Sequence, residues 1–424
     1  MFKRLLPLYQ NSPRFRQVVS LYSVNVMLIP LSIISSIIIT RFLGTVGFGD
    51  FKFLTYVINF SLVLFNFGFF QAGNRALVLN TDSEKTREYY GSMLAILAGL
   101  FLVISIFLIS YAIIDKNISE KGLRIMLISI IPFSWIFLLN NCFEVLFQAD
   151  NRIDLLTRGK IYPKFIFFLS VLILYLFFFN CTGNRLKIIW ICFLGTYIIG
   201  YLPIIYKVNP SFKNLRIRIN EIWSFNKTYG FNVYFGALFS TGFSALTGLL
   251  VSYFGVNNSG VGFYALALTI AEPLSFIPNV IATTHYKDFS TKTSVPKRLI
   301  LITIAVSFSA LMLTWILVGP FIKFFYGPEF RPVILLTYIV SIGVVMNGFA
   351  DFFNRFLGSH GEGKALRNSA IVVGFCIMVF NLTLIPLFGE KGAAYTLVFS
   401  GLIYILNILW YYRRLVITLV KNKG

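Results

Sequence analysis

Carboxylate, amide and guanidinium side chains occur inside segments of the sequence that are otherwise almost entirely apolar. Asn141 and Glu144 are three residues apart in one such segment, and Asp351 and Arg355 are four apart in another. These spacings place each pair on one face of an α-helix. Ionisable groups inside a membrane normally face a bundle interior or a water-filled cavity, because burying them in lipid is costly. We therefore expect contact with a polar solute, or hydrogen bonds between helices and a local Asp351–Arg355 ion pair as the alternatives.

A third carboxylate, Glu272, stands directly before Pro273 in an apolar segment that also contains Pro278 and Asn279. Prolines free backbone carbonyl groups and favour a bend in a membrane helix. A carboxylate at such a bend suits a moving gate, so Glu272 is the candidate for coupling to a proton or Na⁺. The alternative is a carboxylate held by an amide or hydroxyl group of a neighbouring helix.

Basic residues stand at the ends of the same apolar segments. Arg41 and Lys52 flank the first turn, and Arg75 follows the second apolar segment. Guanidinium and ammonium groups bind phosphate oxygens. These three residues are therefore candidates for receiving an anionic headgroup, and solvation at the membrane surface is the alternative.

Several kinds of chemistry find no support in the sequence. The glycine-rich turn at 44–49 lacks the Gly-Lys-Ser/Thr ending of a nucleotide-binding loop. The two histidines fall in different loops, whereas a zinc site needs three or four ligands that converge. The cysteines form no close pairs and are interpreted as core residues. We expect no ATPase, no metal and no other cofactor. The four cysteines are Cys142, Cys181, Cys192 and Cys376.

The elements that position these residues are predicted to be membrane-spanning helices. Of the 424 residues, 57% are hydrophobic and only 12% are charged, against about 25% charged in soluble proteins. Apolar stretches of about 20 residues, the length of one bilayer crossing, recur along the chain. We expect an all-α membrane protein with about twelve spans. They are placed at 19–40, 51–72, 91–114, 123–147, 160–180, 187–206, 229–254, 261–284, 299–324, 332–356, 367–388 and 393–412.

The positive charge is interpreted as a topology signal. A net charge of +21 could suggest a nucleic-acid binder, but such proteins gather basic residues on one soluble face. With a cytoplasmic N-terminus, most of the 37 Lys and Arg residues fall in cytoplasmic segments, as the positive-inside rule requires. We expect a multi-pass protein of the bacterial inner membrane with both termini in the cytoplasm, no cleaved signal peptide and no nucleic-acid partner.

The two halves of the chain resemble each other. An offset of 213 residues aligns Gly47 and Gly49 with Gly260 and Gly262. The same offset places Asn59 on Glu272 and Asn66 on Asn279, and an offset of 210 aligns the fourth span with the tenth. An even number of spans per half gives parallel repeats. We therefore expect an N-terminal lobe at 1–206, a cytoplasmic linker at 207–228 and a C-terminal lobe at 229–424.

Three short motifs give the chain a family resemblance: 43–49 (LGTVGFG), 67–76 (FGFFQAGNRA) and 260–264 (GVGFY). The sequence resembles the polysaccharide exporters of the MOP superfamily, and within it the Wzx-type flippases of O-antigen and capsule repeat units. The resemblance implies two six-helix lobes around a central cationic cavity that opens alternately to each side. It also implies a cargo, undecaprenyl-diphosphate-linked oligosaccharide, which moves from the cytoplasmic to the periplasmic leaflet.

The predicted function is therefore transport rather than catalysis. Expected partners are the lipid-linked glycan, membrane lipids, and a polymerase and chain-length regulator of the same pathway. A MATE-type antiporter of cationic molecules is the main alternative; a lipid II flippase often has extra spans, and a membrane polymerase or ligase typically has a long periplasmic loop. Glu272 is the ion-coupling candidate. The cavity candidates are Arg41, Lys52, Asn59, Asn66, Arg75, Asn141, Glu144, Asn279, Asp351 and Arg355.

Overall fold

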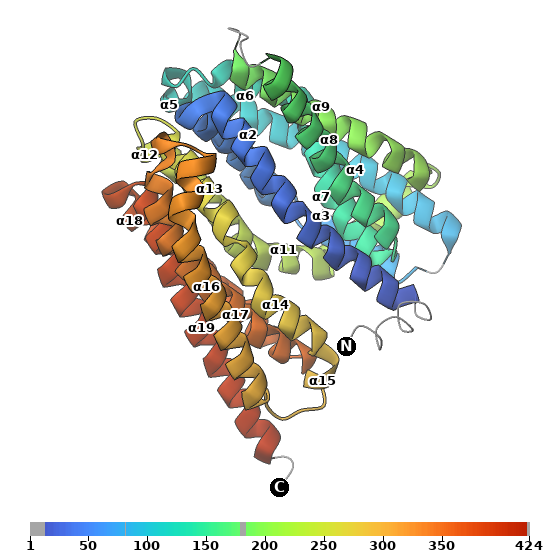
Figure 1. The fold of residues 1–424 in the computed structure, drawn as a ribbon. Helices are drawn as coiled ribbons and strands as arrows, with labels where there is room; N and C mark the ends of the chain where they lie inside the picture. The colour runs from blue at the N-terminus through green and yellow to red at the C-terminus, as the bar shows by residue number, and fades with distance from the viewer. Residues whose placement is uncertain (1–12, 81, 179–183, 422–424) are drawn as a thin grey trace. The chain divides into compact units, whose positions relative to one another are not determined.

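The computed structural model describes residues 13–80, 82–178 and 184–421, and all regular secondary structure in these ranges is helical (Figure 1). Cys181 lies outside the described residues. The helices are α2 (Pro13–Leu64), α3 (Phe69–Val78), α4 (Ser83–Ile114), α5 (Lys116–Glu120), α6 (Arg124–Ile130), α7 (Ser134–Ala149), α8 (Ile153–Phe178), α9 (Arg185–Val208), α10 (Leu215–Phe225), α11 (Phe231–Ala237), α12 (Phe243–Phe254), α13 (Ser259–Ala271), α14 (Pro273–Thr284), α15 (Tyr286–Phe289), α16 (Lys297–Phe325), α17 (Pro332–Ser359), α18 (Gly363–Phe388) and α19 (Glu390–Lys421).

The described helices account for the expected number of membrane crossings. Ten stretches are long and apolar enough to span a bilayer. The first, Ser23–Leu64, has 42 residues, which corresponds to about 63 Å of helix, twice the bilayer core. Gly44 interrupts it with a φ of 70°, so this stretch supplies two crossings. The pair α11 and α12, joined by a π-helical turn at Leu238–Gly242, supplies one more. The prediction of an all-α fold with about twelve spans is confirmed.

Two breaks inside spans fall at residues that the sequence had singled out. After α2 ends, Phe67 and Gly68 have φ values of 46° and 84°, and the Asn66 Oδ1 atom accepts a hydrogen bond of 2.8 Å from the Gly68 backbone N–H. The side chain of Asn66 therefore stabilises this turn. Glu272 lies at the junction of α13 and α14, where Pro273 has no N–H to continue the helical ladder.

The chain divides into two compact units. Unit 1 contains Ser61–Phe235 and the described part of Met1–Phe42, and unit 2 contains Leu43–Phe60 and Gly236–Gly424 up to residue 421. The second arm of α2 therefore packs with the C-terminal helices, although it belongs to the N-terminal half of the sequence. The division into lobes at 1–206 and 229–424 stays a prediction about the sequence repeat.

The first glycine motif contacts the third inside unit 2. The Cα atom of Gly49 lies so close to α13 that an added Cβ would be 1.8 Å from the Asn258 backbone oxygen. A Cβ on Gly262 would likewise be 3.0 Å from the Gly49 nitrogen. Beside this contact, Asn258 donates a hydrogen bond of 2.7 Å to Asp50 and accepts one of 2.6 Å from Ser252. The motifs thus permit close packing of two helices.

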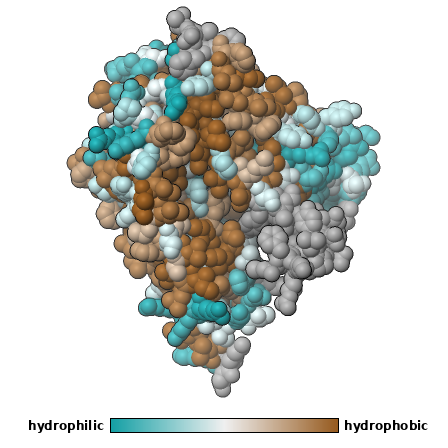
Figure 2. Space-filling view, viewed as in Figure 1, coloured by the Kyte–Doolittle hydropathy of each residue, from teal (hydrophilic) through white to brown (hydrophobic). Residues whose placement is uncertain are grey.

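The surface of the long helices is largely apolar, as Figure 2 shows for one face. Large side chains such as Ile106, Leu176 and Ile316 are 64–70% exposed. In contrast, unit 2 has a packed interior in which Phe289 and Phe356 are fully buried. An apolar exterior of this kind suits contact with lipid tails.

Candidate functional site

The polar stripe of the fourth span lies on α7 in unit 1 and contacts two neighbouring helices. The Glu144 carboxylate pairs with the Lys160 ammonium of α8 at 2.6 Å. One helical turn before Glu144, the Asn140 side-chain oxygen accepts a hydrogen bond from the Tyr201 hydroxyl of α9. Gly159 permits this approach, because a Cβ there would lie 2.9 Å from the Tyr201 hydroxyl oxygen.

The Glu144–Lys160 pair is partly exposed. The Glu144 side chain is 35% exposed and that of Lys160 is 26% exposed, and Asn141 on the same helix is half-buried. A charged pair in a membrane span is unstable against lipid tails, so its open side requires polar surroundings. The pair can therefore bind a polar solute, with the ammonium group as the donor to an anion.

The polar stripe of the tenth span lies on α17 in unit 2 and has a related arrangement. The Tyr404 hydroxyl of α19 donates a hydrogen bond of 2.9 Å to Asp351 and accepts one of 2.8 Å from Asn354. The Arg355 Nε atom donates to the Asn279 side-chain oxygen of α14 at 3.4 Å. Asn279 also donates to the Ser275 backbone oxygen at 3.1 Å. Arg355 thus connects α17 to α14 through an amide group.

Both units therefore place a tyrosine of the last long helix on the polar stripe of the fourth. In unit 1 this is Tyr201 on Asn140, and in unit 2 it is Tyr404 on Asp351. The correspondence extends the predicted repeat from residue types to side-chain contacts. Sequence reasoning missed both tyrosines and Lys160. Lys160 was counted only as a topology charge, although it lies seven residues inside α8.

Glu272 and its repeat equivalent Asn59 are both exposed in unit 2. The backbone oxygen of Glu272 accepts hydrogen bonds from the Ser275 N–H at 3.1 Å and the Ser275 hydroxyl at 2.8 Å. Within the described part of the chain, no side chain donates to the Glu272 carboxylate at hydrogen-bond distance. An exposed carboxylate on a span can exchange a proton or bind a cation from water.

The remaining cationic candidates lie on separate elements. Arg41 is exposed on the first arm of α2, in unit 1. The Lys52 ammonium, in unit 2, lies 5.4 Å from the centre of the Phe48 ring. Arg75 is exposed on α3 of unit 1, with its guanidinium 6.0 Å from the centre of the Tyr229 ring. Arg75 and Tyr229 thus form a cation–aromatic pair that an anion can still approach.

Metal-ligating side chains do not converge in the described parts of the chain. Over these ranges, no group of three or more His, Cys, Asp or Glu residues could hold a metal ion. Cys142, Cys192 and Cys376 are free.

Comparisons with known proteins agree with this architecture. No family model matches the chain. It is 21% identical over 356 residues to the capsular polysaccharide biosynthesis protein CapF of Staphylococcus aureus, over 80% of this chain and 86% of that protein. It is 23% identical over 205 residues to the multidrug export protein MepA of Staphylococcus haemolyticus, over 43% of this chain and 45% of that protein.

The similar solved structures are transporters. The lipid II flippase MurJ in an inward closed conformation matches with a TM-score of 0.72 and 13% identity, over 94% of this chain and 87% of MurJ. An inward-facing multidrug resistance MATE family transporter of the MOP superfamily matches with a TM-score of 0.67 and 14% identity, over 96% of this chain and 100% of that one. This chain has the fold of the MOP superfamily. The resemblance drawn from the glycine motifs is confirmed at that level, and the MOP fold identifies a multi-pass membrane protein.

Proposed function

We propose that this MOP-fold protein translocates undecaprenyl-diphosphate-linked oligosaccharide repeat units of capsule or O-antigen across the bacterial inner membrane. The head of the cargo would pass from the cytoplasmic to the periplasmic leaflet by alternating access. The observation that carries the proposal is the partly exposed Glu144–Lys160 pair inside the spans. The name of the relative CapF, which covers most of this chain, points to the same class of glycan.

The chemistry of the cargo explains why such residues are useful. A diphosphate and its sugars cannot cross hydrocarbon unaided, whereas the polyprenyl tail can remain in lipid. Lys160 and Arg355 offer ammonium and guanidinium groups to phosphate oxygens, and Arg75 does so at the end of α3. Amide groups such as Asn59 and Asn141 suit sugar hydroxyls. Transport thus requires no covalent step by the protein.

The energy source is proposed to be an ion gradient. Glu272 is exposed on a span, and a carboxylate there can bind a proton or Na⁺ on one side of the membrane and release it on the other. The flanking Pro273 lets α13 and α14 move separately. Both termini are proposed to be cytoplasmic, and a polymerase with a chain-length regulator would consume the cargo at the periplasmic face.

A MATE-type antiporter of cationic molecules is the second candidate, favoured by the similarity to a MATE transporter over the whole chain. Such a cargo requires acidic residues that are free to bind it. Glu144 is engaged by Lys160 and Asp351 by Tyr404, which leaves Glu272 as the more accessible carboxylate of the three. This pattern favours an anionic cargo with a single coupling carboxylate.

The proposal is tested in cells that lack the gene. We expect them to lose surface polysaccharide and to accumulate lipid-linked repeat units facing the cytoplasm, and the wild-type gene should restore export. Lys160→Gln should restore export poorly, and Lys160→Arg should restore it well. Normal surface polysaccharide in the deletion strain, together with sensitivity to cationic drugs, would support the antiporter instead.

A further inference from the structure

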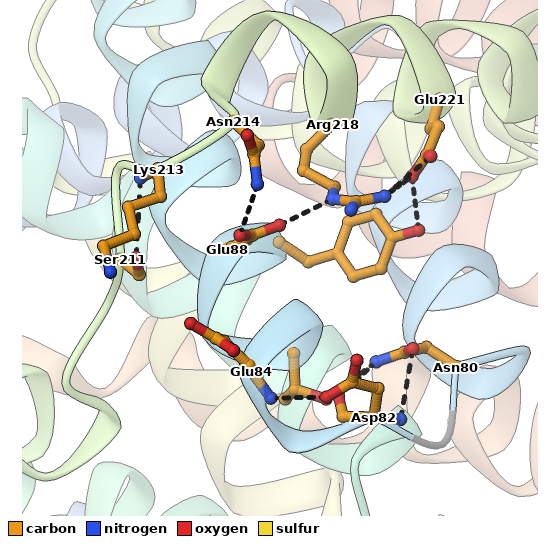
Figure 3. A network of polar contacts seen from close by, with 11 residues as sticks. Asn80, Asp82, Glu84, Glu88, Ser211, Lys213, Asn214, Arg218 and Glu221 are labelled. Atoms are coloured by element: carbon orange, nitrogen blue, oxygen red, sulfur yellow. Dashed lines mark hydrogen bonds and ion pairs between the residues drawn. The ribbon is translucent and has the colours of Figure 1, made fainter.

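The helix between the two halves, α10, is fixed to unit 1 by a network of polar contacts (Figure 3). The Arg218 Nε atom lies 2.7 Å from the Glu88 carboxylate of α4, and the two side chains are only 12% and 5% exposed. Arg218 also pairs with Glu221 at 2.7 Å. Asn214 donates to Glu88 at 2.9 Å, and the Tyr89 hydroxyl donates to Glu221 at 2.6 Å.

Backbone contacts extend this attachment to the segment before α10. The Ser211 N–H donates to the Arg87 backbone oxygen at 2.9 Å, and the Arg87 Nε atom donates to the Asn209 backbone oxygen at 2.8 Å. Gly91 makes the close approach possible, because a Cβ there would lie 2.1 Å from the Ser211 oxygen. Ile222 on the same side of α10 is fully buried. The linker is thus a docked helix with one face fixed to unit 1.

The opposite side of α10 is exposed and combines basic with apolar residues. We call it the α10 outer face and define it by Lys213, Arg216, Ile217, Trp223 and Lys227. Positions 213, 216, 217, 223 and 227 lie within about 120° of one another at 100° per residue, opposite the docked positions 218 and 222. Ile217 is 54% exposed and Trp223 is 48% exposed.

The charge of this face is uncompensated. Among the described residues, no carboxylate lies within ion-pair distance of Lys213, Arg216 or Lys227. The single acidic residue between 207 and 229 is Glu221, and Arg218 occupies it. Trp223 is 5.5 Å from the Phe69 ring and 5.8 Å from the Lys227 ammonium, so its ring is held in place. A rigid tryptophan beside cations is the composition of a membrane-interface helix.

We infer that the α10 outer face binds the anionic headgroups of phospholipids in the leaflet on the linker side of the membrane. Lys213, Arg216 and Lys227 contact the lipid phosphates, and Ile217 and Trp223 enter the boundary between headgroups and acyl chains. Three features select this partner over a soluble one: the charge is positive, the apolar side chains are interspersed with it, and the helix joins two membrane spans directly. The surface is separate from the residues proposed to handle the cargo.

Lipid binding is tested with purified full-length protein in phosphatidylcholine nanodiscs with and without phosphatidylglycerol. Phosphatidylglycerol should raise the thermal stability of the wild-type protein and bind it saturably. Neutralising Lys213, Arg216 and Lys227 to Gln should weaken this binding roughly a hundredfold, since each cation near an anionic surface contributes about fivefold. A matched control neutralises Lys116, Lys187 and Lys391, which are exposed at other helix ends; it should bind like the wild type.

The position of the helix is tested by tryptophan quenching. Brominated phosphatidylglycerol should quench a component of the fluorescence more strongly than brominated phosphatidylcholine does, and this component should be absent in Trp223→Phe. Equal phosphatidylglycerol binding by the wild type and the outer-face variant would overturn the inference. So would equal quenching of the wild type and Trp223→Phe, because Trp223 would then be away from the lipid.

Discussion

Replacing Gly49 by alanine is expected to disrupt the contact between the second arm of α2 and α13. The new Cβ would lie 1.8 Å from the Asn258 oxygen and 2.4 Å from the Asn258 carbonyl carbon, which are backbone atoms that cannot rotate away. The two helices must separate by more than an ångström. Overpacking of this kind costs about 3 kcal/mol, and the helix propensity of alanine returns about 1 kcal/mol. The net destabilisation is therefore about 2 kcal/mol.

Gly47→Ala is the matched control, two residues away in the same helix. Its Cβ would meet the Leu43 side chain, at 3.2 Å, and the helix propensity gain applies equally. We expect Gly47→Ala to be neutral or stabilising by up to about 1 kcal/mol, and export to persist. Thermal unfolding of both variants in the same detergent measures the difference. Equal melting temperatures would refute the close packing of Gly49 on Asn258.

Three further outcomes follow from the polar contacts. The exchange of Glu144→Lys with Lys160→Glu should restore the stability lost in either single variant, by about 1 kcal/mol, but not export, because the cation then stands on the wrong helix; unfolding and surface polysaccharide are measured together. Tyr404→Phe should destabilise unit 2 by about 1 kcal/mol in thermal unfolding, through loss of its hydrogen bonds. Burial raises the pKa of Glu221, but its hydrogen bonds and Arg218 outweigh this and lower the pKa. The attachment of α10 should therefore persist above pH 4.5 and weaken as the pH falls further, seen as faster hydrogen exchange in α10.

The crossings and the polar stripes could be predicted because they depend on local composition. An apolar run of about 20 residues needs a bilayer, and residues three or four apart share a helical face. Pairing between distant segments has no such local signal. The stripe of α7 was predicted from Asn141 and Glu144, but nothing in the spacing shows that Lys160 and Tyr201 approach it from two other helices.

Turn chemistry and packing changed the meaning of two predicted positions. Asn66 was grouped with the polar face of its span, whereas its side chain accepts a hydrogen bond from Gly68 in a helix break. The 43–49 motif indicated a family before any contact was known. In the structure its glycine at 49 lets α2 pack on α13 and joins Leu43–Phe60 to unit 2. A hydropathy pattern cannot reveal which helices a span packs against.

Transfer of the cargo head across a bilayer by the purified protein tests the central claim most directly. Proteoliposomes would contain an undecaprenyl-diphosphate-linked oligosaccharide in both leaflets, and an impermeant glycosidase would be added outside. The account predicts that the wild-type protein exposes nearly all of the glycan to the enzyme, while Lys160→Gln leaves about the inner half protected over the same time. Persistent protection of the inner half with wild-type protein, under an imposed ion gradient, would contradict it.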